Sequence, residues 1–248
     1  MIIKHPTPNH KEGLICLWIE AFDEPRESAE TFFATAFSPD RSLICLKEDT
    51  VVAGLYWFDC LWNNKKVAYI YAVATLKSHR GQGLCNKLMQ KTHEKLTEKG
   101  YVGAILVPAE DSLFSFYGKM GYLPCCPGAI PPEKIPCHSE VLRTEESVPN
   151  SQFSILNSQL TLTPITIEEY LTLQKDLLPQ DAVLHTPTAY KYLKHFGEFY
   201  KTETGILCKI EEDIQERLPY LPEGEMASMY LPLTEDKTLP TYFAHPLA

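Results

Sequence analysis

The chain lacks several features that would assign it to a special class of protein. No apolar run in its 248 residues approaches about 18 residues, so we expect no transmembrane helix. The first residues show no charged segment followed by an apolar one, so we expect no secretory signal peptide. There is also no low-complexity segment and no short-period repeat. These absences leave an ordinary globular protein, whose hydrophobic content of 44% suffices for a core.

The eight cysteines form no Cys-x-x-Cys pair, and most of them lie within apolar patterns. Cys125 and Cys126 are adjacent, which suits neither a zinc knuckle nor a disulfide framework. Cys137 and His138 are neighbours in a proline-rich stretch, with no third partner beside them in sequence. We therefore expect reduced, mostly buried thiols, no metal site and a cytoplasmic location.

The negative charge is concentrated in the second half of the chain. Residues 1–150 carry a formal charge of −2, whereas residues 151–248 carry −7. An acidic half argues against nucleic acid, and against an anionic membrane, as the main partner. It would favour a cationic amine nearby, although an acidic, solvated face without a ligand explains the same charge. The sequence leaves the oligomeric state open.

Residues 80–85, Arg-Gly-Gln-Gly-Leu-Cys, stand between a predicted strand at 67–75 and a helix with Leu84, Leu88 and Leu96 on one face. Two glycines at such a turn allow backbone N–H groups to point at one spot, and the helix N-terminus adds a partial positive charge. The pattern predicts a pyrophosphate-binding site. A tight turn without a ligand is the alternative interpretation of the same six residues.

A second motif follows about thirty residues later. Residues 102–107 are a short apolar run typical of a buried strand. The next segment places Leu113, Phe116, Tyr117 and Met120 at helical spacing, before Gly121 as a natural C-terminal stop. Taken alone, Tyr117 is one more core aromatic residue. The order of elements gives it a second interpretation, because it follows a strand, a phosphate-binding turn, a helix and another strand.

These two segments resemble the GCN5-related N-acetyltransferases, the GNAT superfamily, over roughly residues 1–125. Arg80 and Gly83 match the family's Arg/Gln-x-x-Gly-x-Gly/Ala pattern, but Cys85 stands where Gly or Ala is usual. Residues 116–122 resemble the family's Phe/Leu-Tyr-x-x-x-Gly-Phe segment. Glu110 and Asp111 replace an Asn that often precedes it.

The resemblance implies a mixed α/β fold that uses acetyl-CoA as co-substrate and a small-molecule or peptide amine as acceptor. It implies that Tyr117 is the general acid for the coenzyme A thiolate. It also implies that main-chain groups of Val73, Ala74 and Thr75 bind the pantetheine arm and the acyl carbonyl. The residues implied for the pyrophosphate loop are Arg80, Gly81, Gln82, Gly83, Leu84 and Cys85.

No general base can be identified from the sequence. The strand at 67–75 carries no Asp or Glu, so an acid directly on it is excluded. Glu20, Asp59 and Tyr71 are candidates, and a water chain to a backbone carbonyl is an equal alternative. Several aromatic residues either line a substrate pocket or belong to the core: Trp18, Phe22, Phe32, Trp57 and Trp62.

The element order predicts a mixed sheet covered by helices, followed by a smaller α+β region. We expect residues 1–126 to be an acyl-CoA-binding catalytic domain, residues 127–150 a proline-rich connector, and residues 151–248 a companion domain. The second half echoes the first without its glycine motif, which indicates a degenerate second copy or an unrelated accessory domain. Its predicted elements are helices at 166–178 and 211–218, a helix from 186, a hairpin at 199–210, and strands at 159–164, 226–233 and 239–243.

The sequence therefore predicts an acyl-CoA-dependent N-acyltransferase that moves acetyl to a small primary amine by direct attack. A protein that binds acyl-CoA as a sensor or scaffold, without turnover, is the alternative. A dinucleotide-binding protein is disfavoured because no acidic residue closes a second strand about twenty residues after the loop.

Overall fold

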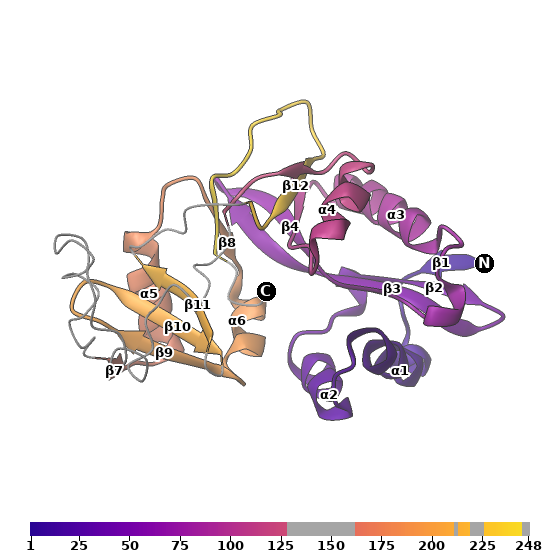
Figure 1. Cartoon of the computed structure of the whole chain (residues 1–248), viewed down its shortest axis with the longest axis horizontal. Coiled ribbons are helices and arrows are strands. Elements are labelled where there is room, and N and C mark those ends of the chain that lie inside the picture. Colours follow the sequence, from indigo (N-terminus) through magenta and orange to yellow (C-terminus); the bar gives the residue numbers. More distant parts are fainter. Residues whose placement is uncertain (128–161, 211–212, 219–225, 245–248) are drawn as a thin grey trace, which may run out of the picture.

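The computed structural model describes residues 1–127, 162–210, 213–218 and 226–244. In this part of the chain, a mixed sheet of nine strands carries helices on both faces, and a second sheet of four strands lies beside it (Figure 1). The predicted mixed α/β fold is confirmed. Residues 137–138, proposed above as neighbours without a partner, lie outside the described residues.

The first half follows the predicted order of strands and helices. Its elements are β1 (Ile2–Lys4), α1 (Lys11–Phe22), α2 (Arg26–Thr35), β2 (Ser42–Lys47), β3 (Thr50–Trp62), β4 (Lys65–Thr75), α3 (Leu84–Glu98), β5 (Gly103–Leu106), α4 (Asp111–Gly118) and β6 (Leu123–Pro124). The second half contributes β7 (Thr163–Pro164), α5 (Ile167–Leu177), β8 (Ala182–His185), α6 (Pro187–Leu193), β9 (Gly197–Lys201), β10 (Ile206–Ile210), β11 (Asp213–Leu218), β12 (Met229–Pro232) and β13 (Tyr242–Phe243).

The large sheet buries a different core on each face, because successive side chains of a strand point to opposite sides. Tyr56 and Phe58 of β3 pack in the core that α1 and α2 complete. Leu55 and Trp57 of the same strand belong to the core beneath α3 and α4. Figure 1 shows the two helix pairs on opposite faces of the sheet. The strands between them are therefore fixed from both sides.

Strands from the second half complete the large sheet. β12 lies between β5 and β6 and runs antiparallel to both, while β8 pairs with β3 and with β13. The approach of β12 requires a glycine on β5, because a Cβ at Gly103 would lie 1.9 Å from the Tyr230 hydroxyl oxygen. The pattern of residues 226–243 predicted strands correctly, but did not indicate which sheet they join. The division of the chain into domains stays a prediction.

The second sheet, in the order β11-β10-β9-β7, contains an element that was predicted wrongly. Residues 213–218 form a strand paired with β10, whereas the sequence suggested a helix at 211–218. The acidic Glu216 is buried together with Leu218, so tertiary pairing overrides the helical pattern of that segment. Glu216 accepts hydrogen bonds from Tyr170, from Gln174 at 2.5 Å and from Tyr242 of β13 at 3.0 Å. Burial nevertheless raises the pKa of Glu216 above its usual value.

Candidate active site

Strand β4 separates from β5 halfway along its length. Its parallel pairing with β5 involves only Val67, Ala68 and Tyr69. Three residues after Tyr69, Ala72 has a left-handed backbone, with φ of 48°, and the register with β3 shifts at this point. Such a bulge bends the strand and increases its twist. From Ile70 onward, β4 therefore has no strand partner on its β5 side among the described residues.

The free side of β4 presents main-chain groups. Leu76 donates its N–H to the carbonyl oxygen of Val52 on β3 at 3.0 Å. Because main-chain groups alternate between the two edges of an antiparallel strand, those of Thr75 and Val73 point away from β3. Ala74 is buried and directs its main-chain groups to Gly54 of β3. Of the three residues predicted to bind the pantetheine arm, Val73 and Thr75 thus have main-chain groups available.

The loop after β4 has the backbone conformation that its glycines allow. Gly81 and Gly83 have φ of 74° and 70°, a left-handed region that costs other residues about 1 kcal/mol or more. In the described part of the chain, the N–H groups from Gly81 to Leu84 have no hydrogen-bond acceptor. Gly83 is the N-cap of α3, so the positive end of the helix dipole adds to these donors. The loop can therefore receive an anion.

The other loop residues are in different positions. Arg80 is exposed and donates from Nε to the Thr75 carbonyl at 3.2 Å, which ties the loop to β4. Gln82 is exposed, whereas the Leu84 side chain is buried in the core beneath α3. Leu84 can therefore contact a ligand only through its main chain. Burial raises the pKa of the Cys85 thiol to about 11, so this thiol stays protonated at neutral pH.

A cavity of about 380 Å³, here called the loop cavity, lies between the free side of β4 and helix α4. It contains Tyr117, which is buried, and whose pKa is raised by burial and secondarily by the nearby Cys85. The Tyr117 hydroxyl keeps its proton at neutral pH and has no hydrogen-bond partner among the described residues. The full lining is Ala21, Phe22, Val73, Ala74, Thr75, Arg80, Cys85, Glu110, Leu113, Phe116 and Tyr117. The cavity thus joins the two sequence motifs, but Gly81, Gln82, Gly83 and Leu84 lie outside its lining.

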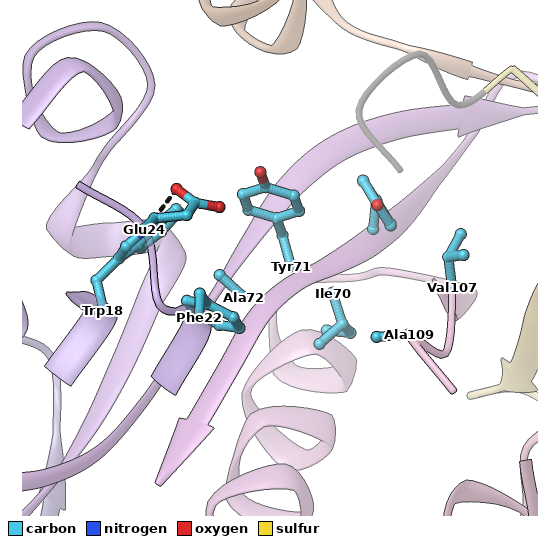
Figure 2. Close-up of a pocket in the computed structure, with 9 residues that line it drawn as sticks. Trp18, Phe22, Glu24, Ile70, Tyr71, Ala72, Val107 and Ala109 are labelled. Atoms are coloured by element: carbon cyan, nitrogen blue, oxygen red, sulfur yellow. Dashed lines mark hydrogen bonds between the residues drawn. The ribbon is translucent and has the colours of Figure 1, made fainter. Parts of the chain in front are cut away.

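A second cavity of about 320 Å³, the aromatic cavity, opens where β4 and β5 part (Figure 2). It shares Phe22 with the loop cavity. Its lining is Trp18, Phe22, Glu24, Tyr69, Ile70, Tyr71, Ala72, Val107 and Ala109. Of the aromatic residues suggested for a pocket, Trp18 and Phe22 are found here. Phe32, Trp57 and Trp62 are instead buried in the core.

The three candidate bases have different surroundings. Glu20 accepts the N–H of Lys77 at 2.6 Å, and Asp59 pairs with Arg41 at 3.1 Å and accepts from Tyr101. Tyr71 alone lines the aromatic cavity, but burial, with a further contribution from Tyr192, raises its pKa well above the usual value. A tyrosine that holds its proton so firmly does not act as a base at neutral pH.

Among the described residues, Glu24 is the one carboxylate in the lining of the aromatic cavity, and no sequence pattern indicated it. It lies in the turn between α1 and α2, where its Oε2 accepts a 2.9 Å hydrogen bond from Trp18 Nε1. Figure 2 shows this carboxylate beside the Tyr71 ring. Its distance of about fifty residues from the glycine motif explains why sequence patterns alone do not connect them.

The first half of the molecule matches a known protein family. Residues 3–125 match the sequence model of a family described as acetyltransferase (GNAT) domain. The N-terminal half of this chain is a GNAT domain. The match covers both motifs and β1 to β6 but ends before the strands that the second half adds to the sheet.

Solved structures extend the similarity beyond the GNAT domain. A GCN5-related N-acetyltransferase from Kribbella flavida is 14% identical, with a TM-score of 0.58 over 94% of this chain and 72% of that chain. Another from Anabaena variabilis is 17% identical, with a TM-score of 0.58 over 94% of this chain and 59% of that chain. At these identities the likeness shows a shared fold alone. No curated protein matches the chain.

The described residues offer neither a metal-binding group nor a membrane-spanning helix. No group of three or more His, Cys, Asp or Glu side chains there is arranged to hold a metal ion. None of its helices combines the length and the apolar character needed to cross a bilayer. The seven cysteines in this part are free, as expected, and five of them are buried. The GNAT domain thus offers anion-binding main-chain groups, a protonated tyrosine and two adjoining cavities.

Proposed function

We propose that this protein transfers an acetyl group from acetyl-CoA to a small primary amine. The observation that carries the proposal is the loop cavity, which brings together the free side of β4, Arg80 and Cys85 at the two ends of the glycine loop, and Tyr117. The GNAT family match supports acetyl transfer in general. The adjoining aromatic cavity supports an acceptor of small size.

The main chain holds the donor in this proposal. The N–H groups from Gly81 to Leu84, at the N-terminus of α3, bind the pyrophosphate. The groups of Val73 and Thr75 that point away from β3 bind the pantetheine arm, much as an added strand would. The exposed side chains of Arg80 and Gln82 lie beside the loop and are available to the phosphates. The bulge at Ala72 keeps β5 from occupying the same edge.

Acetyl-CoA supplies a thioester whose carbonyl carbon forms a bond with the amine nitrogen as its carbon–sulfur bond breaks. A main-chain N–H of β4 would stabilise the negative charge that develops on the carbonyl oxygen, an effect worth about 3–4 kcal/mol in known cases. Tyr117 donates its hydroxyl proton to the departing sulfur. The amine attacks in its uncharged form, after releasing one proton to solvent, and its nitrogen loses a second proton to solvent as the amide forms. Solvent returns one proton to Tyr117, so the tyrosine is restored and one proton is released in each cycle. The products are the acetylated amine and the free thiol.

The raised pKa of Tyr117 suits this role. A group must still hold its proton at neutral pH in order to give it to a thiolate. Since burial is the main cause of the shift, the hydroxyl remains protonated through the physiological range. The hydroxyl has no hydrogen-bond partner within the described part of the chain, which leaves it available to the sulfur.

The test is release of free thiol from acetyl-CoA across a panel of small amines. Tyr117→Phe keeps the ring and removes only the hydroxyl, so we expect kcat to fall roughly 100-fold while acetyl-CoA binding is retained. Tyr122→Phe is the control, because Tyr122 contacts the Tyr117 ring but its hydroxyl is hydrogen-bonded to His93, and Tyr122 does not line the loop cavity. Tight acetyl-CoA binding without thiol release from any amine would instead favour the sensor or scaffold.

A further inference from the structure

Three cavities of the molecule adjoin one another in a defined order. Phe22 is shared by the loop cavity and the aromatic cavity, and Glu24 is shared by the aromatic cavity and a third one. This third cavity, the outer cavity, has a volume of about 610 Å³ and is lined by the α1–α2 turn, α2, α6 and neighbouring residues such as His195. Glu24 therefore lies at the end of the aromatic cavity that is remote from the donor.

The carboxylate of Glu24 is fixed but electrically unpaired. Trp18 Nε1 holds its Oε2 at 2.9 Å, and its Oε1 has no hydrogen-bond or ion-pair partner in the part of the chain that the structure describes. The nearest arginine in sequence, Arg26, is engaged by Glu12 and, at 3.1 Å, by Glu30. A half-buried carboxylate without a cation is poorly compensated, so a positively charged ligand would stabilise it.

The walls beside Glu24 also favour a cation. Phe22, Tyr69 and Tyr71 supply aromatic rings, whose faces carry negative electrostatic potential. No lysine or arginine of the described ranges lines the cavity. A ligand group that suits both a carboxylate and aromatic faces is an ammonium ion. Figure 2 shows the Glu24 carboxylate next to the Tyr71 ring, on the side away from Val107 and Ala109.

We infer that the acceptor is a primary amine that carries a second cationic group at the other end of a short apolar chain, and that Glu24 binds this second group. The inference rests on the proposed function, which places the reacting amine at the Phe22 end next to the loop cavity. The apolar chain would lie along Ile70, Tyr71 and Ala72, with its charged end at Glu24. The same side chain is then a specificity determinant for the acceptor.

The experiment compares two acceptors of equal length, 1,4-diaminobutane and 1-aminobutane. We expect wild-type protein to show a kcat/KM about tenfold or more higher for the diamine. Glu24→Gln keeps an oxygen for Trp18 Nε1 but removes the charge, so it should lower kcat/KM for the diamine and leave the monoamine unchanged. Glu27→Gln is the matched control, since Glu27 lies three residues further on, in the first turn of α2, and lines only the outer cavity.

Calorimetric binding of 1,4-diaminobutane to the protein–CoA complex separates this inference from the proposed function. Weaker diamine binding by Glu24→Gln, and not by Glu27→Gln, supports the inference even if no amine is acetylated. Turnover with no diamine preference, equal losses for both amines in Glu24→Gln, or equal effects of the two substitutions would each overturn it. Thermal unfolding of both variants verifies that they are folded.

Discussion

The loop cavity and the aromatic cavity lie next to each other along β4, yet they are constructed differently. The loop cavity and the glycine loop beside it offer mainly main-chain groups: the free side of β4, loop N–H groups and a helix N-terminus. The aromatic cavity offers side chains from α1, the α1–α2 turn, β4 and the residues after β5. Main-chain groups suit a donor that is the same in every reaction, whereas side chains can distinguish one acceptor from another. The first would therefore serve the donor and the second the acceptor.

The largest effect is expected for Gly83→Glu, which should impair the donor site. A carboxylate at the loop would occupy the pyrophosphate-binding site and repel the negatively charged pyrophosphate. We therefore expect acetyl-CoA binding to weaken on the order of 100-fold or more. Gly100→Glu is the matched control, because Gly100 also has a left-handed backbone, with φ of 78°, and an open surface for a Cβ. It lies beyond the opposite end of α3. Calorimetry should show a loss for Gly83→Glu alone, and equal losses would refute the loop assignment.

Phe22→Ala tests whether the two cavities depend on each other, because Phe22 lines both of them. Phe22 is 37% exposed, so its truncation should cost little stability. We expect KM to rise about tenfold for the donor and for the amine, because the wall between them is lost. Steady-state kinetics with each substrate varied in turn measures both effects. A change confined to one substrate would mean that the two cavities function separately.

The smallest expected effect is a pH dependence of folding stability. His93 of α3 forms a 2.9 Å hydrogen bond with the Tyr122 hydroxyl, and burial lowers the pKa of His93 from 6.5 to about 4. Between these values the unfolded chain binds a proton that the folded chain does not, so folding stability falls as the pH drops from 6.5 to 4.

We expect this contribution to reach about 1–3 kcal/mol at pH 4. His93→Gln should reduce the slope of unfolding free energy against pH in that range, as measured by denaturant titrations at several pH values. Identical slopes for the two proteins would show that the histidine does not titrate as described.

The contrast between the glycine loop, which is specified locally, and the aromatic cavity, which is assembled from distant elements, explains how much could be predicted from the sequence. The succession of strand, glycine turn, helix, strand and short helix along the chain, and the positions of Gly81, Gly83 and Tyr117 in it, were predicted, because local patterns specify a turn, a helix face and a cap. Local patterns carry no information about which distant elements meet. The pairing of β12 with β5, the strand at 213–218 and the place of Glu24 beside β4 all depend on such meetings.

The assignment of Ala74 illustrates the limit at the level of one residue. The sequence placed Val73, Ala74 and Thr75 together at the donor, but alternation along β4 turns the main-chain groups of Ala74 toward Gly54. The bulge at Ala72 determines where that alternation restarts. An alanine with a left-handed backbone has no sequence signature, so the phase of the strand became visible only in the structure.

The most direct test of this account is a crystal structure of the protein with coenzyme A. We predict pyrophosphate oxygens within hydrogen-bond distance of the N–H groups between Gly81 and Leu84, and the thiol sulfur in the loop cavity beside the Tyr117 hydroxyl. A coenzyme bound elsewhere, or one whose sulfur lies away from Tyr117, would contradict it.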